Sequence, residues 1–241
     1  MVQEFRQPVV WITGAGRGIG REIAIQFSLI GCKVVLTSRT VRELTSVQKE
    51  ITKLGGEAFV IRCDIGKASE ISRAHKSIVN KLGSVDVLID NAGITSFKKF
   101  EETSLEDFDS IVRTNLRGAF LCIKEVLPDM IKRKDGWIIN IASVVAVKTF
   151  KNSSAYSAAK AGLVAMLRVL REEVRQHNVK VLTIFPGATS TKIWGTKLQK
   201  LSKKMMDAKS VAETVLSLYR LKLKDAFVEE LIIRPTLGDL E

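Results

Sequence analysis

A glycine-rich turn near the N-terminus constrains the fold of this 241-residue chain more than any other feature. It follows residues 9–12, an apolar run typical of a strand, and it precedes apolar residues at helical spacing. Glycines at a strand-to-helix turn permit positive φ angles and a close approach of the backbone to a ligand. The helix N-terminus then presents free N–H groups, so the turn predicts a seat for a dinucleotide pyrophosphate. The expected contacts are Gly14, Gly16, Arg17, Gly18, Ile19 and Gly20.

Strand-like and helix-like segments alternate along the whole chain. The expected strands span residues 8–13, 33–38, 57–62, 85–90, 136–142, 179–185 and 227–233. The expected helices span residues 18–30, 40–54, 67–82, 104–132, 154–177 and 207–220, with a break in the fourth near Asn115. This alternation predicts an α/β fold with a parallel sheet. Since the chain has no low-complexity linker, internal repeat or break in composition, we expect one domain covering residues 1–241.

The composition is that of a soluble globular protein, with 46% apolar and 27% charged residues. No apolar run approaches the roughly 18 residues of a membrane span, so no membrane partner is expected. The N-terminus lacks a signal-peptide pattern. Cys32, Cys63 and Cys122 are scattered without the spacing of metal ligands. They favour a reducing, cytoplasmic compartment and no bound metal.

The net charge of +12 admits two interpretations. One is nucleic-acid binding. However, the basic residues are spread over many expected helices, and no motif interleaves them with aromatic residues for base stacking. The sequence therefore favours a solvated basic surface without a nucleic-acid partner. Such a surface would still attract anionic ligands, including a phosphorylated cofactor.

Three residues in the second half of the chain indicate proton transfer. Tyr156 and Lys160 are four positions apart in an expected helix, and Ser143 follows an expected strand. A Tyr and a Lys at this spacing also occur on ordinary exposed helix faces, so the pair alone is weak evidence. Hydride transfer to a ketone leaves an alkoxide that needs a proton, and a nearby cation lowers the pKa of a Tyr toward a useful range. Beside a dinucleotide site, the three residues predict interconversion of a carbonyl and an alcohol.

Six motifs in order along the chain resemble those of a known family. They are the Thr-Gly-x-x-x-Gly-x-Gly run at residues 13–20, Asn91-Ala92-Gly93, Asn115, Ser143, the Tyr156 and Lys160 pair, and Pro186-Gly187. The chain resembles the short-chain dehydrogenase/reductase family over nearly its whole length. The resemblance implies a single-domain Rossmann fold, with a doubly wound seven-stranded parallel sheet, helices on both faces and ligands at the carboxyl ends of the strands. It also implies a homodimer or homotetramer with a two-fold interface.

The resemblance and the chemistry together assign roles to four side chains. Ser143 is expected to hydrogen-bond the substrate carbonyl, and Tyr156 is expected to transfer the proton. Lys160 is expected to lower the pKa of Tyr156 and to hold the hydroxyls of the nicotinamide ribose. Asn115 is expected to help hold a water that connects Lys160 to solvent. The cofactor supplies the hydride, and the protein supplies position and protons.

The residues after the second expected strand favour NADP(H) as the cofactor. An acidic residue at this place would bind a ribose 2′-hydroxyl, but position 38 is Ser. Arg39 follows it and offers a planar, permanently charged group suited to a 2′-phosphate. Arg17, in the glycine turn, can approach the same phosphate from the other side. The alternative is that both arginines only face solvent.

Two further loops are expected to contact the cofactor. Asp64, followed by Ile65, ends the third strand, and the resemblance places this carboxylate against the adenine; the alternative is a helix N-cap. Asn91-Ala92-Gly93 ends the fourth strand, where small residues let a ligand approach the backbone. The residue before this motif is usually Asn in the family, and here it is Asp90.

The segment after the sixth expected strand completes the predicted cofactor site. Pro186-Gly187 breaks the chain, and Thr189 and Thr191 follow. The resemblance places the carboxamide of nicotinamide against this segment, with Thr191 as a hydrogen-bonding hydroxyl; the alternative is an ordinary turn. Residues 190–206 are expected to form a basic substrate lid with an apolar face.

The sequence identifies the substrate only as a small-molecule carbonyl compound. The segment around Trp194 and the C-terminal tail resemble those of bacterial sepiapterin-reductase-like carbonyl reductases, which suggests a pteridine or another small ketone. The alternative activity is 3-oxoacyl-[acyl-carrier-protein] reductase, although the usual residues after Asn-Ala-Gly and at the C-terminus of that subgroup are absent. A non-catalytic NADP(H)-sensing protein is the alternative of another class, and the intact Ser, Tyr, Lys and Asn set argues against it.

Overall fold

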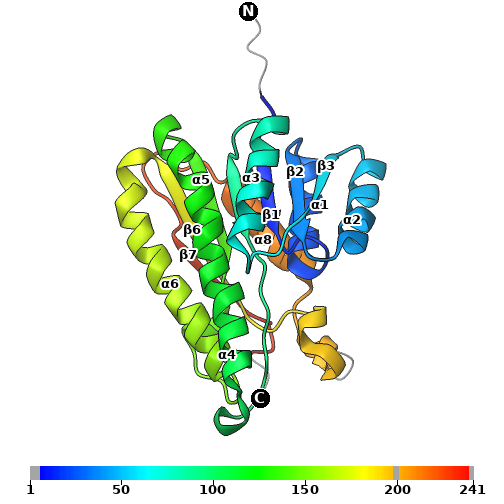
Figure 1. Cartoon of the computed structure of the whole chain (residues 1–241), viewed down its shortest axis with the longest axis vertical. Helices are drawn as coiled ribbons and strands as arrows, with labels where there is room; N and C mark the ends of the chain where they lie inside the picture. The colour runs from blue at the N-terminus through cyan, green and yellow to red at the C-terminus, as the bar shows by residue number, and fades with distance from the viewer. Residues whose placement is uncertain (1–5, 198–200, 239–241) are drawn as a thin grey trace, which may run out of the picture.

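The computed structural model describes residues 6–197 and 201–238, so part of the predicted lid, residues 198–200, lies outside the described chain. Seven parallel strands form one sheet in the order β3-β2-β1-β4-β5-β6-β7 (Figure 1). The strands are β1 (Val9–Thr13), β2 (Lys33–Ser38), β3 (Glu57–Arg62), β4 (Val87–Asp90), β5 (Gly136–Ile141), β6 (Val179–Pro186) and β7 (Glu230–Ile233). The α-helices are α1 (Gly18–Leu29), α2 (Val41–Lys53), α3 (Ala68–Leu82), α4 (Leu105–Val112), α5 (Ala119–Arg133), α6 (Ser154–Val174) and α8 (Ala208–Arg220). Over these residues, no helix is both long enough and apolar enough to span a bilayer.

Helices cover both faces of the sheet, each over its own apolar core. Helices α1, α2 and α8 cover one face, where Ile23, Leu44 and Val215 belong to one buried cluster. Helices α3, α5 and α6 cover the other face, where Ile78 and Leu167 belong to a second cluster. All five residues of β1 are buried, because a parallel strand in the middle of such a sheet faces a core on both sides. The predicted doubly wound α/β fold with a seven-stranded parallel sheet is confirmed.

The predicted helix over residues 104–132 is interrupted. It consists of α4, a π-helical segment (Arg113–Gly118) and α5. The interruption contains Asn115, where a break is predicted from the sequence. A Cβ atom at Gly118 would lie 2.9 Å from the carbonyl oxygen of Ile65, so glycine lets this segment lie directly against the loop after β3. π-Helical turns inside α-helices occur frequently at functional sites.

The last strand begins later than the predicted residue 227. Phe227 instead packs edge-on against Trp137, at a ring-centroid distance of 5.4 Å, before the chain reaches the sheet. Strand β7 then starts at Glu230. Its far end meets the segment after β6, because the Gly187 N–H donates a hydrogen bond of 2.8 Å to the carbonyl of Ile233. The edge strand thereby positions a loop that the sequence assigns to the cofactor.

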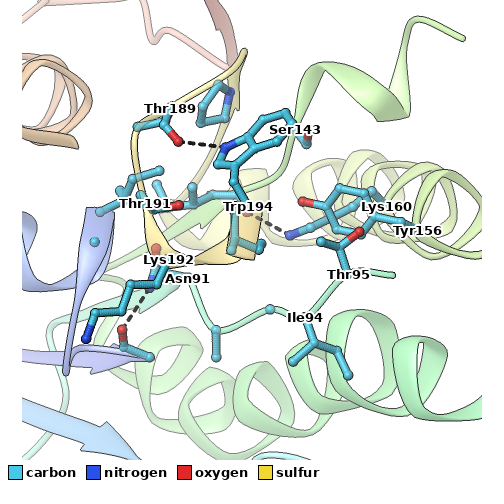
Figure 2. A pocket seen from close by; sticks show the side chains of 18 of the residues that line it. Asn91, Ile94, Thr95, Ser143, Tyr156, Lys160, Thr189, Thr191, Lys192 and Trp194 are labelled. Carbon is cyan, nitrogen blue, oxygen red and sulfur yellow. Dashed lines mark hydrogen bonds between the residues drawn. The ribbon is translucent and has the colours of Figure 1, made fainter. Parts of the chain in front are cut away.

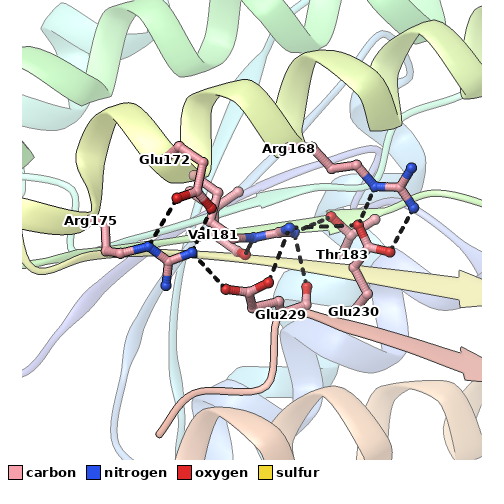
Figure 3. A network of polar contacts seen from close by, with 8 residues as sticks. Arg168, Glu172, Arg175, Val181, Thr183, Glu229 and Glu230 are labelled. Carbon is pink, nitrogen blue, oxygen red and sulfur yellow. Dashed lines mark hydrogen bonds and ion pairs between the residues drawn. The ribbon is translucent and has the colours of Figure 1, made fainter. Parts of the chain in front are cut away.

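A network of charged groups joins α6 to β6 and to the entrance of β7 (Figure 3). The Arg171 side chain is 7% exposed. Its guanidinium donates to the carbonyl oxygen of Val181 at 3.0 Å and to that of Glu229 at 3.1 Å. Arg168 binds the carboxylate of Glu230 with two hydrogen bonds of 2.8 and 2.9 Å. Since Tyr156 and Lys160 lie on α6, this network sets their helix against the strand that leads into the site.

Replacing Arg171 by Met should lower the free energy of unfolding by about 2 to 4 kcal/mol, because buried carbonyl acceptors lose a charged donor. Arg168→Met is the matched control. The Arg168 side chain is 55% exposed, so its ion pair should contribute under about 1 kcal/mol. Urea unfolding followed by circular dichroism measures both losses. Equal losses in the two variants would contradict the role assigned to Arg171.

Candidate active site

A cavity of about 990 Å³ opens at the carboxyl ends of the strands. The loops that follow β1 to β6 all contribute to its wall. Strand β1 lies between β2 and β4, so the strand order reverses direction here, and open α/β sheets bind ligands at such a point. Figure 2 shows Tyr156, Lys160 and Thr95 on one side of this cavity and Asn91 with Lys192 on the other. Of the predicted site residues, Gly20 and Asn115 lie outside the lining of this cavity.

The glycine turn packs tightly against the loop after β4. A Cβ atom at Gly20 would lie 2.4 Å from the Asn91 side-chain nitrogen, and one at Gly14 would lie 2.9 Å from the Ala92 Cα. Gly14 and Gly18 also have φ angles of +66° and +56°, which favour glycine. Asn91 secures the contact by donating its side-chain amide to the carbonyl of Thr13 at 2.9 Å. Glycine at these positions therefore permits both the positive φ angles of the turn and the close approach of the loop after β4.

The first turn of α1 suits a phosphate group. Arg17 at the N-cap is extended, its side chain forms no capping hydrogen bond, and the turn contains no acidic residue. The N–H groups of the first helical turn have no partner within the helix, and the helix dipole favours negative charge at this end. Gly16 is buried beside α2, where a Cβ would lie 2.9 Å from the Cβ of Glu43. Ile19 follows in the cavity wall.

The end of β2 brings Ser38 and Arg39 to the same cavity, as predicted. A residue that sequence reasoning missed lies beside them. The Glu43 carboxylate is 3.6 Å from the Arg17 guanidinium and 3.8 Å from the Lys192 ammonium. Glu43 therefore joins the glycine turn to the segment after β6 through two long ion pairs. Its position one turn into an exposed-looking helix gave no signal of this role.

The loop after β3 places both Asp64 and Ile65 in the cavity wall. The Asp64 carboxylate accepts a hydrogen bond of 3.0 Å from the Gly66 N–H. The N-cap of α3 is Lys67, so Asp64 closes a turn before the helix rather than capping it. Ile65 is 5% exposed and belongs to the core under α3 and α5. Contact of either residue with adenine stays a prediction.

Asn115 binds the backbone that follows the Asn91-Ala92-Gly93 motif. Its side chain accepts from the Ile94 N–H at 2.8 Å and donates to the Ile94 carbonyl at 2.7 Å. Gly93 fits beside it, since a Cβ there would lie 3.3 Å from the Asn115 Oδ1. The side chain thus holds the cavity wall in place. Its predicted part in holding a water stays a prediction.

The three predicted proton-transfer residues come together in the cavity. Ser143 follows β5, and its hydroxyl accepts from the Val145 N–H at 3.3 Å. Burial raises the pKa of Tyr156 to about 12, and a hydrogen bond with the Ser143 hydroxyl opposes that rise. Lys160 is 3% exposed and donates to the carbonyl of Ile141 at 2.8 Å. Burial lowers the pKa of Lys160 to about 8, and the charge of Asp90 opposes that fall.

The direction of the Tyr156 shift differs from the expectation that Lys160 lowers its pKa. The Lys160 ammonium is directed to the end of β5, and removal of the phenol from water is the larger effect on Tyr156. The sequence shows that a Lys lies one turn from a Tyr, but it does not show which acceptor the Lys chooses. The phenol therefore keeps its proton at neutral pH in this arrangement.

The segment after β6 folds over the glycine turn. A Cβ atom at Gly18 would lie 3.0 Å from the Thr191 methyl group. The Thr189 hydroxyl donates to the Gly187 carbonyl at 3.0 Å, so it closes a turn directly after Pro186. The Trp194 indole N–H donates to the Thr189 carbonyl at 2.9 Å (Figure 2). A 3-10 segment (Lys192–Lys197) follows, and contact with a carboxamide stays a prediction.

Comparison with known proteins leads to one family. A family model described as short chain dehydrogenase matches residues 8–202. Sepiapterin reductase of Chlorobaculum tepidum is 34% identical over 240 residues, which cover 97% of this chain and 98% of that protein. A 3-oxoacyl-[acyl-carrier-protein] reductase of Synechocystis is 36% identical over 184 residues, 76% of this chain and 74% of that protein. The structure of an alcohol dehydrogenase from Thermococcus sibiricus, complexed with 5-hydroxy-NADP, has a TM-score of 0.90 at 31% identity, over 98% of this chain and 99% of that chain.

The chain belongs to the short-chain dehydrogenase family. It is therefore an oxidoreductase, and the family resemblance predicted from six sequence motifs is confirmed. Sequence reasoning named Trp194 in the lid of this short-chain dehydrogenase but not its aromatic partner. The Trp194 ring stacks on Phe97 at a centroid distance of 5.5 Å, which joins the segment after β6 to the loop after β4. The two residues are nearly one hundred positions apart, so the sequence alone gave no signal of their contact.

Replacing Asn115 by Ala should lower the free energy of unfolding by about 1 to 3 kcal/mol, because the N–H and carbonyl of Ile94 both lose their partner. The loop that carries Thr95 should loosen as well, so the Michaelis constant for a substrate should rise. Thermal unfolding and steady-state kinetics measure the two effects. An Asn115→Ala protein with unchanged stability and a lower turnover alone would favour the water-holding role instead.

Proposed function

We propose that this short-chain dehydrogenase is an NADP(H)-dependent carbonyl reductase that acts on a small ketone or similar carbonyl compound. One observation carries the proposal. The hydroxyl groups of Ser143 and Tyr156 meet in the same cavity as a glycine turn built to receive phosphate. A phosphate seat and a proton donor in one cavity match the needs of hydride transfer to a carbonyl.

The donor set of the cavity fits NADP(H). The free amides of α1 suit the pyrophosphate, and a side chain on Gly16 or Gly18 would meet its neighbours at 2.9 or 3.0 Å. Arg39 and Arg17 supply permanent positive charge at the place of a 2′-phosphate, with no acidic residue at position 38. Two similar proteins have structures with 5-hydroxy-NADP or NADP, at 31% and 32% identity. When bound, the cofactor would supply the hydride.

The protein's own residues would supply orientation and a proton. Ser143, fixed by the Val145 N–H, would hydrogen-bond the substrate oxygen. Tyr156 retains its proton at neutral pH because burial raises its pKa to about 12, so it can act as a general acid toward a developing alkoxide. Lys160 would hold the hydroxyls of the nicotinamide ribose. Its positive charge would also stabilise the tyrosinate that forms when Tyr156 gives up its proton. Asn115 keeps the cavity wall in place through Ile94.

The substrate that we favour is a pteridine or another small planar ketone. The sepiapterin reductase of C. tepidum matches 97% of this chain, whereas the match to the 3-oxoacyl-[acyl-carrier-protein] reductase covers 76% of it. The stacked rings of Phe97 and Trp194 offer an aromatic surface in the cavity wall. Planar ring systems pack well on such surfaces.

We also propose a homodimer or homotetramer in the cytoplasm. Leu105 and Phe120, on α4 and α5, are 75% and 46% exposed, and apolar groups in such positions suit a two-fold interface. The three cysteines are buried and free, which suits a reducing compartment. One domain over residues 1–241, with residues 190–206 as the substrate lid, completes the proposed organisation.

Arg39→Asp should convert the cofactor preference from NADPH toward NADH, because it places a carboxylate beside the 2′-phosphate. Arg42→Asp is the matched control, since Arg42 lies three residues further along the chain and outside the cavity wall. The ratio of kcat/KM for the two cofactors measures the effect. A fully retained NADPH preference in Arg39→Asp would remove Arg39 from the phosphate site.

A panel of ketones, diketones, sepiapterin and a 3-oxoacyl thioester, assayed with NADPH and NADH, tests the proposed reaction. In Tyr156→Phe, turnover of the best substrate should fall by about 10²- to 10⁴-fold, because only the proton donor is lost. NADPH binding, measured by fluorescence, should change little. Near-normal turnover in Tyr156→Phe would overturn the mechanism, and oxidation of NADPH with no member of the panel would favour a sensing role.

A further inference from the structure

A row of buried polar side chains crosses the carboxyl ends of three neighbouring strands. Thr13 ends β1, Asp90 ends β4, and Asn140 lies next to the end of β5. Their exposed fractions are 0%, 3% and 0%. Since side chains alternate along a strand, Asp90 and Asn140 share the face of Leu88 and Ile138, which belong to the core under α3, α5 and α6. The row therefore lies on the face of the sheet that α3, α5 and α6 cover, and α6 carries Tyr156 and Lys160.

Asp90 is at the centre of this row. Asn140 donates its side-chain amide to one Asp90 oxygen at 2.5 Å, and Thr13 donates its hydroxyl to the other at 3.3 Å. The Thr13 oxygen also accepts from the N–H groups of Asn91 and Ala92, each at 3.0 Å. Both partners of Asp90 are donors, as a carboxylate requires. The Thr13 hydroxyl thus connects Asp90 to the loop after β4, which packs against the glycine turn.

Lys160 enters from α6 on the same side. Its ammonium donates to the Ile141 carbonyl at 2.8 Å, one residue after Asn140. In the described part of the chain, the titratable groups that interact with Asp90 are Lys160 from α6 and Cys122 from α5. Burial raises the pKa of the Cys122 thiol, so it stays neutral. Asp90 and Lys160 form no direct ion pair in the described residues. Asn140, which donates to Asp90, and Ile141, which accepts from Lys160, are consecutive in β5, so the two buried charges lie at the same strand end.

Building on the proposed function, we propose that Asp90 is a positioning residue whose buried carboxylate keeps the Lys160 ammonium charged. A lysine buried beside a tyrosine and an apolar core would otherwise release its proton readily. Asp90 does not itself line the cavity, and it acts through the charge of Lys160.

The directions of the two pKa shifts agree with this role. Burial raises the pKa of Asp90 to about 6, and Lys160 opposes the rise. Burial lowers the pKa of Lys160 to about 8, and Asp90 opposes that fall. Both groups are therefore charged between these two values. Loss of the Asp90 charge removes the effect that raises the Lys160 pKa, so Lys160 should lose its proton at a lower pH.

Asp90→Asn is a conservative way to remove this charge. The Asn140 side-chain oxygen is buried without a hydrogen-bond partner, so an amide at position 90 gains an acceptor for its N–H groups once the Asn140 amide turns over. Its oxygen still accepts from Thr13. Asp90→Ser removes the same charge with a smaller side chain and replaces Asp90→Asn if that protein does not fold. Asp86→Asn is the matched control, because Asp86 lies just before the other end of β4 and pairs with Arg133 at 3.0 Å.

Titration of ¹³Cε-labelled lysine by NMR measures the charge of Lys160 without turnover, and the Lys160 resonance is assigned by its loss in Lys160→Met. In Asp90→Asn the midpoint should fall by roughly one pH unit. In Asp86→Asn it should stay at the wild-type value. An unchanged midpoint in Asp90→Asn, or an equal fall in both variants, would overturn the proposal.

Kinetics provides a second measurement on any carbonyl that the wild-type enzyme reduces. A one-unit fall in the Lys160 midpoint should lower kcat about fivefold at pH 8 and hardly at all at pH 6. A uniform loss at both pH values would indicate a merely structural role and contradict the proposal. If the wild-type enzyme reduces no carbonyl, the proposed function fails, while the NMR titration still decides the role of Asp90.

Discussion

The contact between the glycine turn and the loop after β4 determines how this active site is built. Neither Gly14 nor Gly20 leaves room for a Cβ atom, and Asn91 holds the two loops together through the Thr13 carbonyl. Because β1 and β4 are adjacent parallel strands, their carboxyl ends meet at the point where the strand order reverses. Everything else in the cavity is placed relative to this junction. The Thr13 hydroxyl accepts from two N–H groups of the loop after β4, and the Thr191 methyl group packs against Gly18 of the turn.

Burial, rather than pairing alone, determines the electrostatics of the site. The phenol of Tyr156 and the carboxyl of Asp90 both have raised pKa values, while that of Lys160 is lowered, and burial is the largest cause in each case. Each shift favours a neutral group. The hydrogen bonds and charges around them oppose this tendency in part. At neutral pH Tyr156 therefore holds a proton that it can donate.

Much of this arrangement could be predicted from the sequence, and the reasons are local. Short patterns of residue type predict the glycine turn, the strands and the break near Asn115, and the structure confirms them. The contacts that could not be predicted join distant segments: Glu43 with Lys192, Phe97 with Trp194, and Asp90 with Asn140. The direction of the Lys160 side chain was also missed, because helical spacing places a residue on a face without choosing its acceptor. Packing across the sheet decides such contacts, and a single sequence does not record it.

The location of the three tryptophans has a spectroscopic consequence. Trp11 is fully buried, and its indole donates to the Thr37 hydroxyl. Trp137 packs against Tyr219 and Phe227, on the face of the sheet that α1, α2 and α8 cover. Trp194 alone of the three lines the cavity, where it is stacked on Phe97. A molecule that enters the cavity can therefore touch only one of the three indoles. A fluorescence change that requires direct contact with a small carbonyl compound should originate from Trp194, so this ring is an optical reporter of the segment after β6.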